Sequence, residues 1–89
     1  MIRFKINFKG RVQGVGFRFQ AFRIANDLNI TGSVQNMYDG SVLVYAQGSS
    51  GNIDSFVNAL CSERFIHVDT IDKIEVDLCP DETSFKILY

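Results

Sequence analysis

The sequence is poor in the features that mark several common classes of protein. Its 89 residues include no tryptophan, one proline, one histidine and two cysteines, and no stretch approaches the roughly 18 consecutive apolar residues of a membrane-spanning helix. The formal net charge of −1 supplies no general attraction to nucleic acid or to an acidic membrane surface. We therefore expect neither a nucleic-acid partner nor a membrane partner, and any functional positive charge must be local.

Cysteine and histidine are also too scarce for a zinc centre or a disulfide framework. Cys61, Cys79 and the single histidine, His67, fall short of the four ligands of a structural zinc site. Residues 2–8 carry polar side chains at alternating positions, so they contain no apolar run typical of a signal peptide. We expect a cytoplasmic monomer with free thiols at both cysteines, because cytosolic proteins rarely form disulfides. We expect His67 to be a loop or surface residue.

Apolar residues make up 46% of the chain, which is enough for one hydrophobic core in one domain, residues 1–89. Alternation of apolar and polar residues predicts strands, whereas apolar residues three and four apart predict helices. Asp39-Gly40 is a strong signal for a hairpin turn. The predicted order is strand, helix, strand, strand, helix, strand, over residues 2–8, 17–28, 31–36, 41–47, 53–60 and 71–78. Residues 85–88 can add a short edge strand.

This order satisfies every apolar stripe if both helices cover one face of a mostly antiparallel, four-stranded sheet. In the last long strand, Ile74, Val76 and Leu78 alternate with charged residues, the pattern of a strand with one apolar face. The predicted fold class is therefore α+β, a ferredoxin-like sandwich with the order βαββαβ. Many functions occur on that fold, so the fold alone assigns none.

Three glycines, Gly10, Gly14 and Gly16, lie between the first strand and the first helix. They indicate either a simple tight turn or a nest of N–H groups that binds an anion beside the helix N-terminus. Arg18, in the first helical turn, is disfavoured by the helix dipole by roughly 0.3–1 kcal/mol, and no acidic residue in that turn compensates. A bound dianion would relieve this conflict, because the guanidinium matches two phosphoryl oxygens.

Residues 10–18, Gly-Arg-Val-Gln-Gly-Val-Gly-Phe-Arg, resemble the signature of the acylphosphatase family. The chain also resembles a second segment of that family, at residues 32–36, Gly-Ser-Val-Gln-Asn, and residues 39–42, Asp-Gly-Ser-Val. The resemblance implies hydrolysis of the carboxyl-phosphate bond of small acyl phosphates to a carboxylate and inorganic phosphate. It also implies that inorganic phosphate, as the product, inhibits competitively, and that neither a metal nor a cofactor takes part.

In that family a backbone loop and an arginine bind the phosphoryl group, and an asparagine orients the attacking water. The resemblance places the arginine at Arg18 and the asparagine at Asn36. Without it, Asn36 would be interpreted as a turn residue before the hairpin. The implied donors of the loop are the backbone N–H groups of Gln13, Gly14, Val15, Gly16 and Phe17.

An acyl phosphate suits a site that has few ionisable groups. Its leaving group is a carboxylate, whose conjugate acid has a pKa near ~4, so no general acid is required. The sequence offers no obvious general acid and no carboxylate cluster close to residues 10–18. Positioning and charge stabilisation are the remaining tasks in phosphoryl transfer. Arg11 either adds positive potential at the mouth of the loop or is a solvated loop residue.

The chain departs from the family pattern at two places. Ser33 stands where the family usually has tryptophan, and residues 63–68 replace a segment that often contains Gly-Pro. Two other functions compete with hydrolysis. One is a non-catalytic, anion-binding regulatory module on the same fold. The other is an RNA-binding domain, which needs exposed aromatic residues on central strands, whereas we expect Phe4 and Phe8 to pack under the helices.

Overall fold

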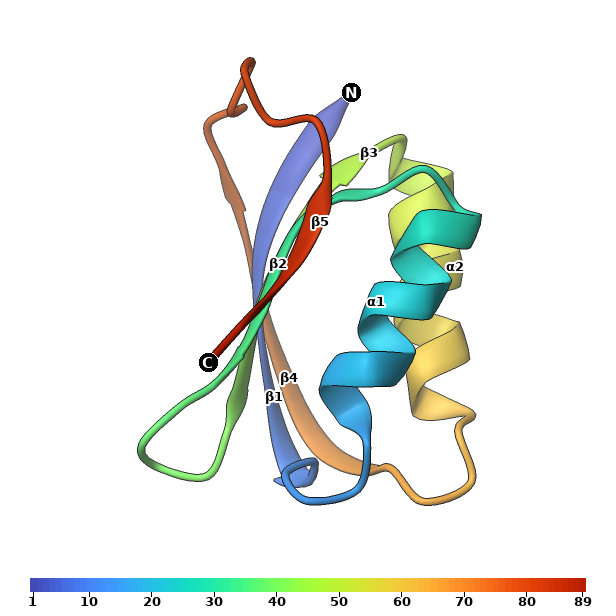
Figure 1. The fold of residues 1–89 in the computed structure, drawn as a ribbon, viewed down its shortest axis with the longest axis vertical. Helices are drawn as coiled ribbons and strands as arrows, with labels where there is room; N and C mark the ends of the chain where they lie inside the picture. Colours follow the sequence, from blue (N-terminus) through green and yellow to red (C-terminus); the bar gives the residue numbers. More distant parts are fainter.

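The structure is a computed structural model that describes all residues, 1–89. In chain order its elements are β1 (Ile2–Arg11), α1 (Phe17–Asp27), β2 (Thr31–Asn36), β3 (Val42–Gly48), α2 (Ser50–Cys61), β4 (His67–Val76) and β5 (Phe85–Leu88). The predicted order of strands and helices is present, together with the short strand near the end of the chain. Both helices pack on one face of the sheet (Figure 1), so the predicted ferredoxin-like sandwich is confirmed.

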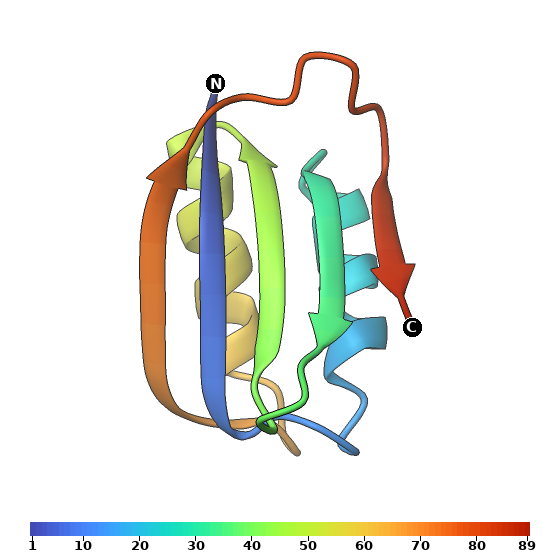
Figure 2. The same cartoon turned by 90° about the vertical axis from the view of Figure 1, so that its left-hand side faces the viewer.

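The sheet contains five strands in the order β4-β1-β3-β2-β5 (Figure 2). Neighbouring strands run antiparallel except β2 and β5, which are parallel. The possible fifth strand at residues 85–88 is therefore present, and its parallel pairing with β2 makes the mostly antiparallel sheet a mixed one. β5 contributes to the core because the ring of Phe85 is buried, with its centroid 6.0 Å from that of Phe56 in α2.

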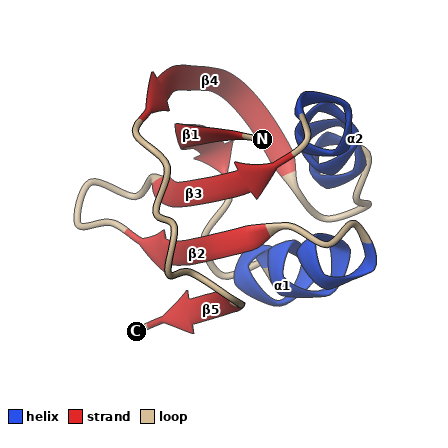
Figure 3. Ribbon diagram, turned by 90° about the horizontal axis from the view of Figure 1, so that it is seen from above, coloured by secondary structure: helices blue, strands red, loops and turns tan.

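The hydrophobic core lies between the sheet and the two helices (Figure 3). The helices bury the stripes expected from their spacing: Phe17, Ala21, Ile24 and Ala25 in α1, and Ile53, Phe56 and Leu60 in α2. Phe8 of β1 is fully buried, as predicted, and its ring centroid lies 5.0 Å from that of Phe17. Because Phe17 is the first residue of α1, this contact anchors the start of the helix, next to the glycine loop, to the sheet.

β1 and β4 are longer at one end than the sequence predicts. Their pairing continues as far as Arg11 and His67, so β1 ends three residues later and β4 begins four residues earlier than expected. Close approach at this end requires a glycine, since a Cβ atom on Gly10 would lie 2.3 Å from the carbonyl oxygen of His67. Pairing between distant segments thus set these bounds, and local periodicity could not reveal them.

The apolar residues of β4 divide between the two faces of the sheet, with Ile74 and Val76 on the face away from the helices. Ile74 pairs with Lys5, whereas Lys73 pairs with Ile6, a core residue, and paired residues project to the same side. Ile74 is accordingly 62% exposed, and Lys73 reaches Asp54 of α2, with 3.4 Å between Nζ and Oδ1. The alternation correctly predicts a strand, but the face with Ile74 and Val76 is not the core face, because the register with β1 pairs Ile74 with Lys5 and Val76 with Arg3.

No helix in the structure is long and apolar enough to cross a membrane. Cys61 and Cys79 are both free and exposed, as predicted. Partial burial raises the pKa of the Cys61 thiol, which leaves it less reactive than an ordinary exposed thiol.

Candidate active site

The glycine loop between β1 and α1 presents backbone N–H groups that have no partner in the protein. Gly14 and Gly16 have φ angles of 74° and 82°, in the left-handed region that favours glycine. None of the N–H groups of residues 13–16 donates a hydrogen bond within the protein. Gly16 caps α1 without a side-chain hydrogen bond, so the first-turn N–H groups of the helix are also free. Such a group of donors is suited to an anion.

Arg18 lies in the first turn of α1, where no acidic residue accompanies it. Its Nη1 donates to the carbonyl oxygen of Leu88 at 3.5 Å, and its Cζ lies 4.9 Å from the centre of the Tyr89 ring. It forms no ion pair with any carboxylate. Leu88 and Tyr89 therefore orient the guanidinium and leave its charge uncompensated, next to the free N–H groups of the loop.

Asn36 is the last residue of β2 and lines the same cleft as Arg18. Its Oδ1 is buried and makes no hydrogen bond, and no other buried side-chain nitrogen or oxygen is in this state. Leaving a buried acceptor unsatisfied costs about 1–3 kcal/mol, so such atoms normally have a partner. A buried acceptor whose free-energy cost no neighbouring group offsets is typical of a functional site.

The cleft that contains these groups has a volume of about 250 Å³. It is lined by Val12, Gly14, Gly16, Phe17, Arg18, Phe19, Asn36, Ile87 and Tyr89. The structure thus brings Arg18, Asn36 and part of the predicted loop together, whereas Gln13 and Val15 do not line this cleft. His67 also lies outside it, exposed at the start of β4. No Asp, Glu or His side chain lines the cleft, and no three metal-ligating side chains gather anywhere in the chain.

The side chain of Gln13 has a structural role that the sequence did not reveal. Its Nε2 donates to the carbonyl oxygens of Met37 and Ser41, both at 2.8 Å. These residues flank the β2–β3 turn, directly after Asn36. One side chain therefore fixes the glycine loop to the strand end that carries Asn36. A glutamine inside residues 10–18 was the only signal in the sequence, and it does not separate a backbone role from a side-chain role.

The β2–β3 turn is held by a second set of hydrogen bonds. Asp39 Oδ1 accepts from both the backbone N–H and the hydroxyl of Ser41, whose Oγ accepts from Asn7 Nδ2 at 3.1 Å. The hydrogen bonds from Ser41 hold the pKa of Asp39 below its ordinary value. The turn predicted from Asp39-Gly40 is present, with a φ angle of 91° at Gly40. This network supports the turn that follows Asn36.

The fold and the cleft together define a ferredoxin-like protein with a glycine loop, an unpaired arginine and an unsatisfied asparagine at one site. Comparison with known proteins identifies the family to which it is related. A model of the acylphosphatase family matches residues 4–87. The chain belongs to the acylphosphatase family, which confirms the resemblance seen in residues 10–18 and 32–42.

Individual relatives match this chain over all or nearly all of its length. A protein from Clostridium acetobutylicum named acylphosphatase is 40% identical over 90 residues, which cover 100% of this chain and 99% of that protein. The crystal structure of acylphosphatase from Bacillus subtilis superposes with a TM-score of 0.92 at 34% identity and covers 100% of both chains. The chain also superposes on part of the crystal structure of full-length HypF in its phosphate- and nucleotide-bound form, with 30% identity and a TM-score of 0.88. This match covers 99% of this chain and 12% of the HypF chain.

Proposed function

We propose that this protein hydrolyses the carboxyl-phosphate bond of small acyl phosphates to a carboxylate and inorganic phosphate. The proposal rests on one observation: unpartnered loop N–H groups lie beside an arginine without a carboxylate partner, in a cleft that also contains Asn36. Membership of the acylphosphatase family supports the same reaction.

The phosphoryl group binds to the N–H groups of residues 13–17 and to Arg18. In the transition state its charge is spread over the equatorial oxygens. N–H donors that the fold has already oriented stabilise this charge without reorganising. Arg18 adds charged donors in a planar fork, and the Leu88 carbonyl and the Tyr89 ring hold that fork in place.

Asn36 orients the attacking water. Its side-chain amide, at the end of β2 and in the lining of the cleft, holds that water by a hydrogen bond. Gln13 holds the loop and the end of β2 at a fixed separation, so the water and the phosphorus stay aligned. The water transfers its proton to a phosphoryl oxygen of the substrate, since no Asp, Glu or His side chain lines the cleft.

The cleft suits an acyl phosphate better than a phosphate ester. An alkyl ester releases an alkoxide, which requires a proton from a general acid in the transition state. A carboxylate leaves without one, because its conjugate acid has a pKa near ~4. No Asp, Glu, His, Lys or Cys side chain lines the cleft, and the Tyr89 ring lies against the Arg18 guanidinium, so the labile mixed anhydride is the substrate class that these residues can serve.

We further propose that the protein acts as a cytoplasmic monomer and as a single domain, without a metal or cofactor. Every strand belongs to one sheet and the buried apolar residues form one cluster, which supports one folding unit. The net charge of −1 and the burial of Phe8 under the helices argue against an RNA-binding role. Inorganic phosphate is expected to bind the loop and compete with the substrate.

The decisive experiment compares benzoyl phosphate with an alkyl phosphate ester, glycerol 3-phosphate, as substrates of the purified protein. Hydrolysis of benzoyl phosphate with little or no hydrolysis of the ester is the expected result, and Asn36→Ala is the control for adventitious activity. Phosphate binding without hydrolysis of benzoyl phosphate would instead identify the non-catalytic, anion-binding module. Hydrolysis of the ester alone would contradict both functions.

A further inference from the structure

A second cleft, of about 480 Å³, lies on the other side of the glycine loop. It is lined by Arg11, Val15, Arg64, Phe65, Ile66 and His67. These residues come from the end of β1, from the loop itself and from the segment between α2 and β4, which run side by side at one end of the molecule (Figures 1 and 2). The last of these segments, residues 63–68, is one of the two places at which the chain departs from the acylphosphatase pattern.

The second cleft contains two arginines without a carboxylate partner. Arg11 and Arg64 form no ion pair, whereas Arg3 pairs with Glu82 at 2.7 Å. Arg23 likewise pairs with Glu63 at 3.0 Å. Together with Arg18, the unpaired arginines of this protein all line the two clefts beside the glycine loop. Such a distribution favours anion binding over general surface solvation.

The carboxylates closest to the second cleft are already engaged. Glu63 precedes Arg64 in the chain, but its Oε1 accepts from Arg23 Nη2 at 3.0 Å. Asp69 lies 3.3 Å from His67 Nε2, and both of these side chains are largely exposed. Asp69 therefore lies at the edge of the cleft beside the lining residue His67, and neither Asp69 nor Glu63 forms an ion pair with Arg11 or Arg64.

The cleft also has an apolar lining next to its charges. Ile66 is buried, Val15 is half-buried, and Phe65 is 69% exposed. The guanidinium of Arg64 lies over the Phe65 ring, with its Cζ 5.5 Å from the ring centre. A bare inorganic ion would not use these apolar surfaces, whereas an organic anion would cover them.

We propose that this cleft is a second anion site, which takes a carboxylate or phosphate group carried on a small carbon skeleton. Val15 lines this cleft, and its neighbours Gly14 and Gly16 line the first, so the two sites share one loop. Because adjacent Cα atoms are only about 3.8 Å apart, the two clefts are neighbours. The carbon skeleton of an acyl phosphate bound in the first cleft can therefore extend into the second. The anionic group belongs either to such a substrate or to a separate small molecule. The first source rests on the proposed function, and the second does not.

The first arm of the test compares substrates that differ by one carboxylate. The kcat/KM values of 3- and 4-carboxybenzoyl phosphate are measured relative to that of benzoyl phosphate, for the wild type and for Arg11→Gln/Arg64→Gln. If the anionic end belongs to the substrate, the ratio falls about tenfold in the variant, the effect of losing one charge-assisted hydrogen bond. Lys5→Gln/Lys86→Gln removes the same charge from outside both clefts and should leave the ratio unchanged.

The second arm uses terephthalate, a dicarboxylate, as the probe of the cleft. Backbone amide NMR shifts of the ¹⁵N-labelled protein are followed while inorganic phosphate saturates the glycine loop. Shifts confined to Val15 and residues 64–67, absent in Arg11→Gln/Arg64→Gln, establish the site for a separate anion.

A wild-type protein that shows neither the kinetic preference nor these shifts would overturn the second site. Failure of the proposed function is distinguishable, since benzoyl phosphate would then not be hydrolysed at all while terephthalate still reports on the cleft.

Discussion

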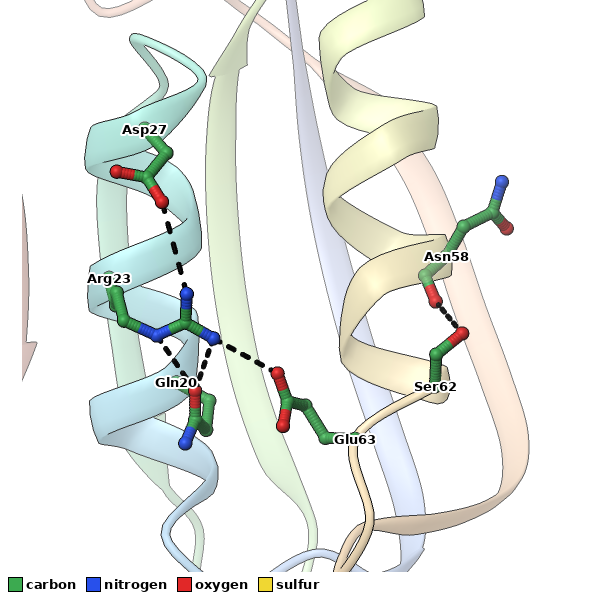
Figure 4. A network of polar contacts seen from close by, with 6 residues as sticks. All are labelled: Gln20, Arg23, Asp27, Asn58, Ser62 and Glu63. Atoms are coloured by element: carbon green, nitrogen blue, oxygen red, sulfur yellow. Dashed lines mark hydrogen bonds and ion pairs between the residues drawn. The ribbon is translucent and has the colours of Figure 1, made fainter.

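Helix α1 contains two arginines whose surroundings differ completely. Arg23 donates to Gln20 and pairs with Glu63 at 3.0 Å and with Asp27 at 3.9 Å, as Figure 4 shows. Arg18, five residues earlier, has no carboxylate partner and lies beside a loop of free N–H groups. Arg23 ties α1 to the segment that directly follows α2, whereas Arg18 is available to an anion. Polar groups are satisfied where they support the fold and unsatisfied where a ligand can complete them.

Substituting each arginine in turn tests this comparison most strongly. Arg18→Gln removes a preorganised charge, so kcat/KM for benzoyl phosphate should fall about 10²–10³-fold. Arg23→Gln removes only partly exposed ion pairs, worth less than about 1 kcal/mol, so it should lower the melting temperature slightly and leave kcat/KM nearly unchanged. Steady-state kinetics and thermal unfolding of both variants give the result. An equal loss of activity in both would remove the distinction.

Asn36→Ala separates catalysis from phosphate binding. Losing the group that orients the water should lower kcat about 10²-fold, while the inhibition constant of inorganic phosphate stays close to that of the wild type. Stability should not fall, because the removed Oδ1 makes no hydrogen bond within the protein. Competitive inhibition by phosphate is measured for this variant and for Arg18→Gln. Equal weakening of phosphate in the two would refute the division of roles.

Gln13→Ala tests a satisfied side chain next to the unsatisfied ones. It deletes two hydrogen bonds of 2.8 Å and leaves the carbonyls of Met37 and Ser41 without this donor, so stability should fall by about 1–3 kcal/mol. A misplaced loop should also lower kcat about tenfold. Gln20→Ala is the matched control, since that glutamine bonds only to Arg23. Chemical denaturation that ranks the two variants equally would argue against this positioning role.

Asp39→Asn should have a smaller effect, which depends on pH. The folded-state pKa of Asp39 lies below its ordinary value of 3.8 because Ser41 donates to its carboxylate. A lowered pKa stabilises the folded state above the ordinary value, and that stabilisation disappears as the pH falls through the lowered pKa. Asp39→Asn should therefore melt below the wild type at pH 7, and the difference should vanish in strong acid. A difference independent of pH would exclude the charge of Asp39 as its cause.

Removing metals should have the smallest effect of all. We expect EDTA to leave the turnover of benzoyl phosphate unchanged, because the proposed mechanism uses only N–H groups, a guanidinium and an amide. The measurement is the rate before and after dialysis against EDTA, with restoration by divalent cations as the control. A rate that falls and is restored by a metal would show that Arg18 does not supply the site's positive charge alone.

Much of the fold could be predicted because its signals are local. The apolar stripe of α1 follows from spacings of three and four, and the β2–β3 turn follows from Asp39-Gly40. Residues 10–18 indicated the glycine loop and Arg18, and the second family segment indicated Asn36. What failed was non-local. The bounds of β4 and the outward direction of Ile74 depend on the register of its pairing with β1.

The sequence by itself determined the order of the elements, the position of the glycine loop and the resemblance to the family. These follow from short motifs and periodicities, which neighbouring residues impose on one another. Only the tertiary structure decided that Gln13 fastens the loop to the end of β2, and that Leu88 and Tyr89 orient Arg18. It also placed Arg11 and Arg64 in one cleft. Such contacts join residues far apart in the chain, and no local pattern specifies them.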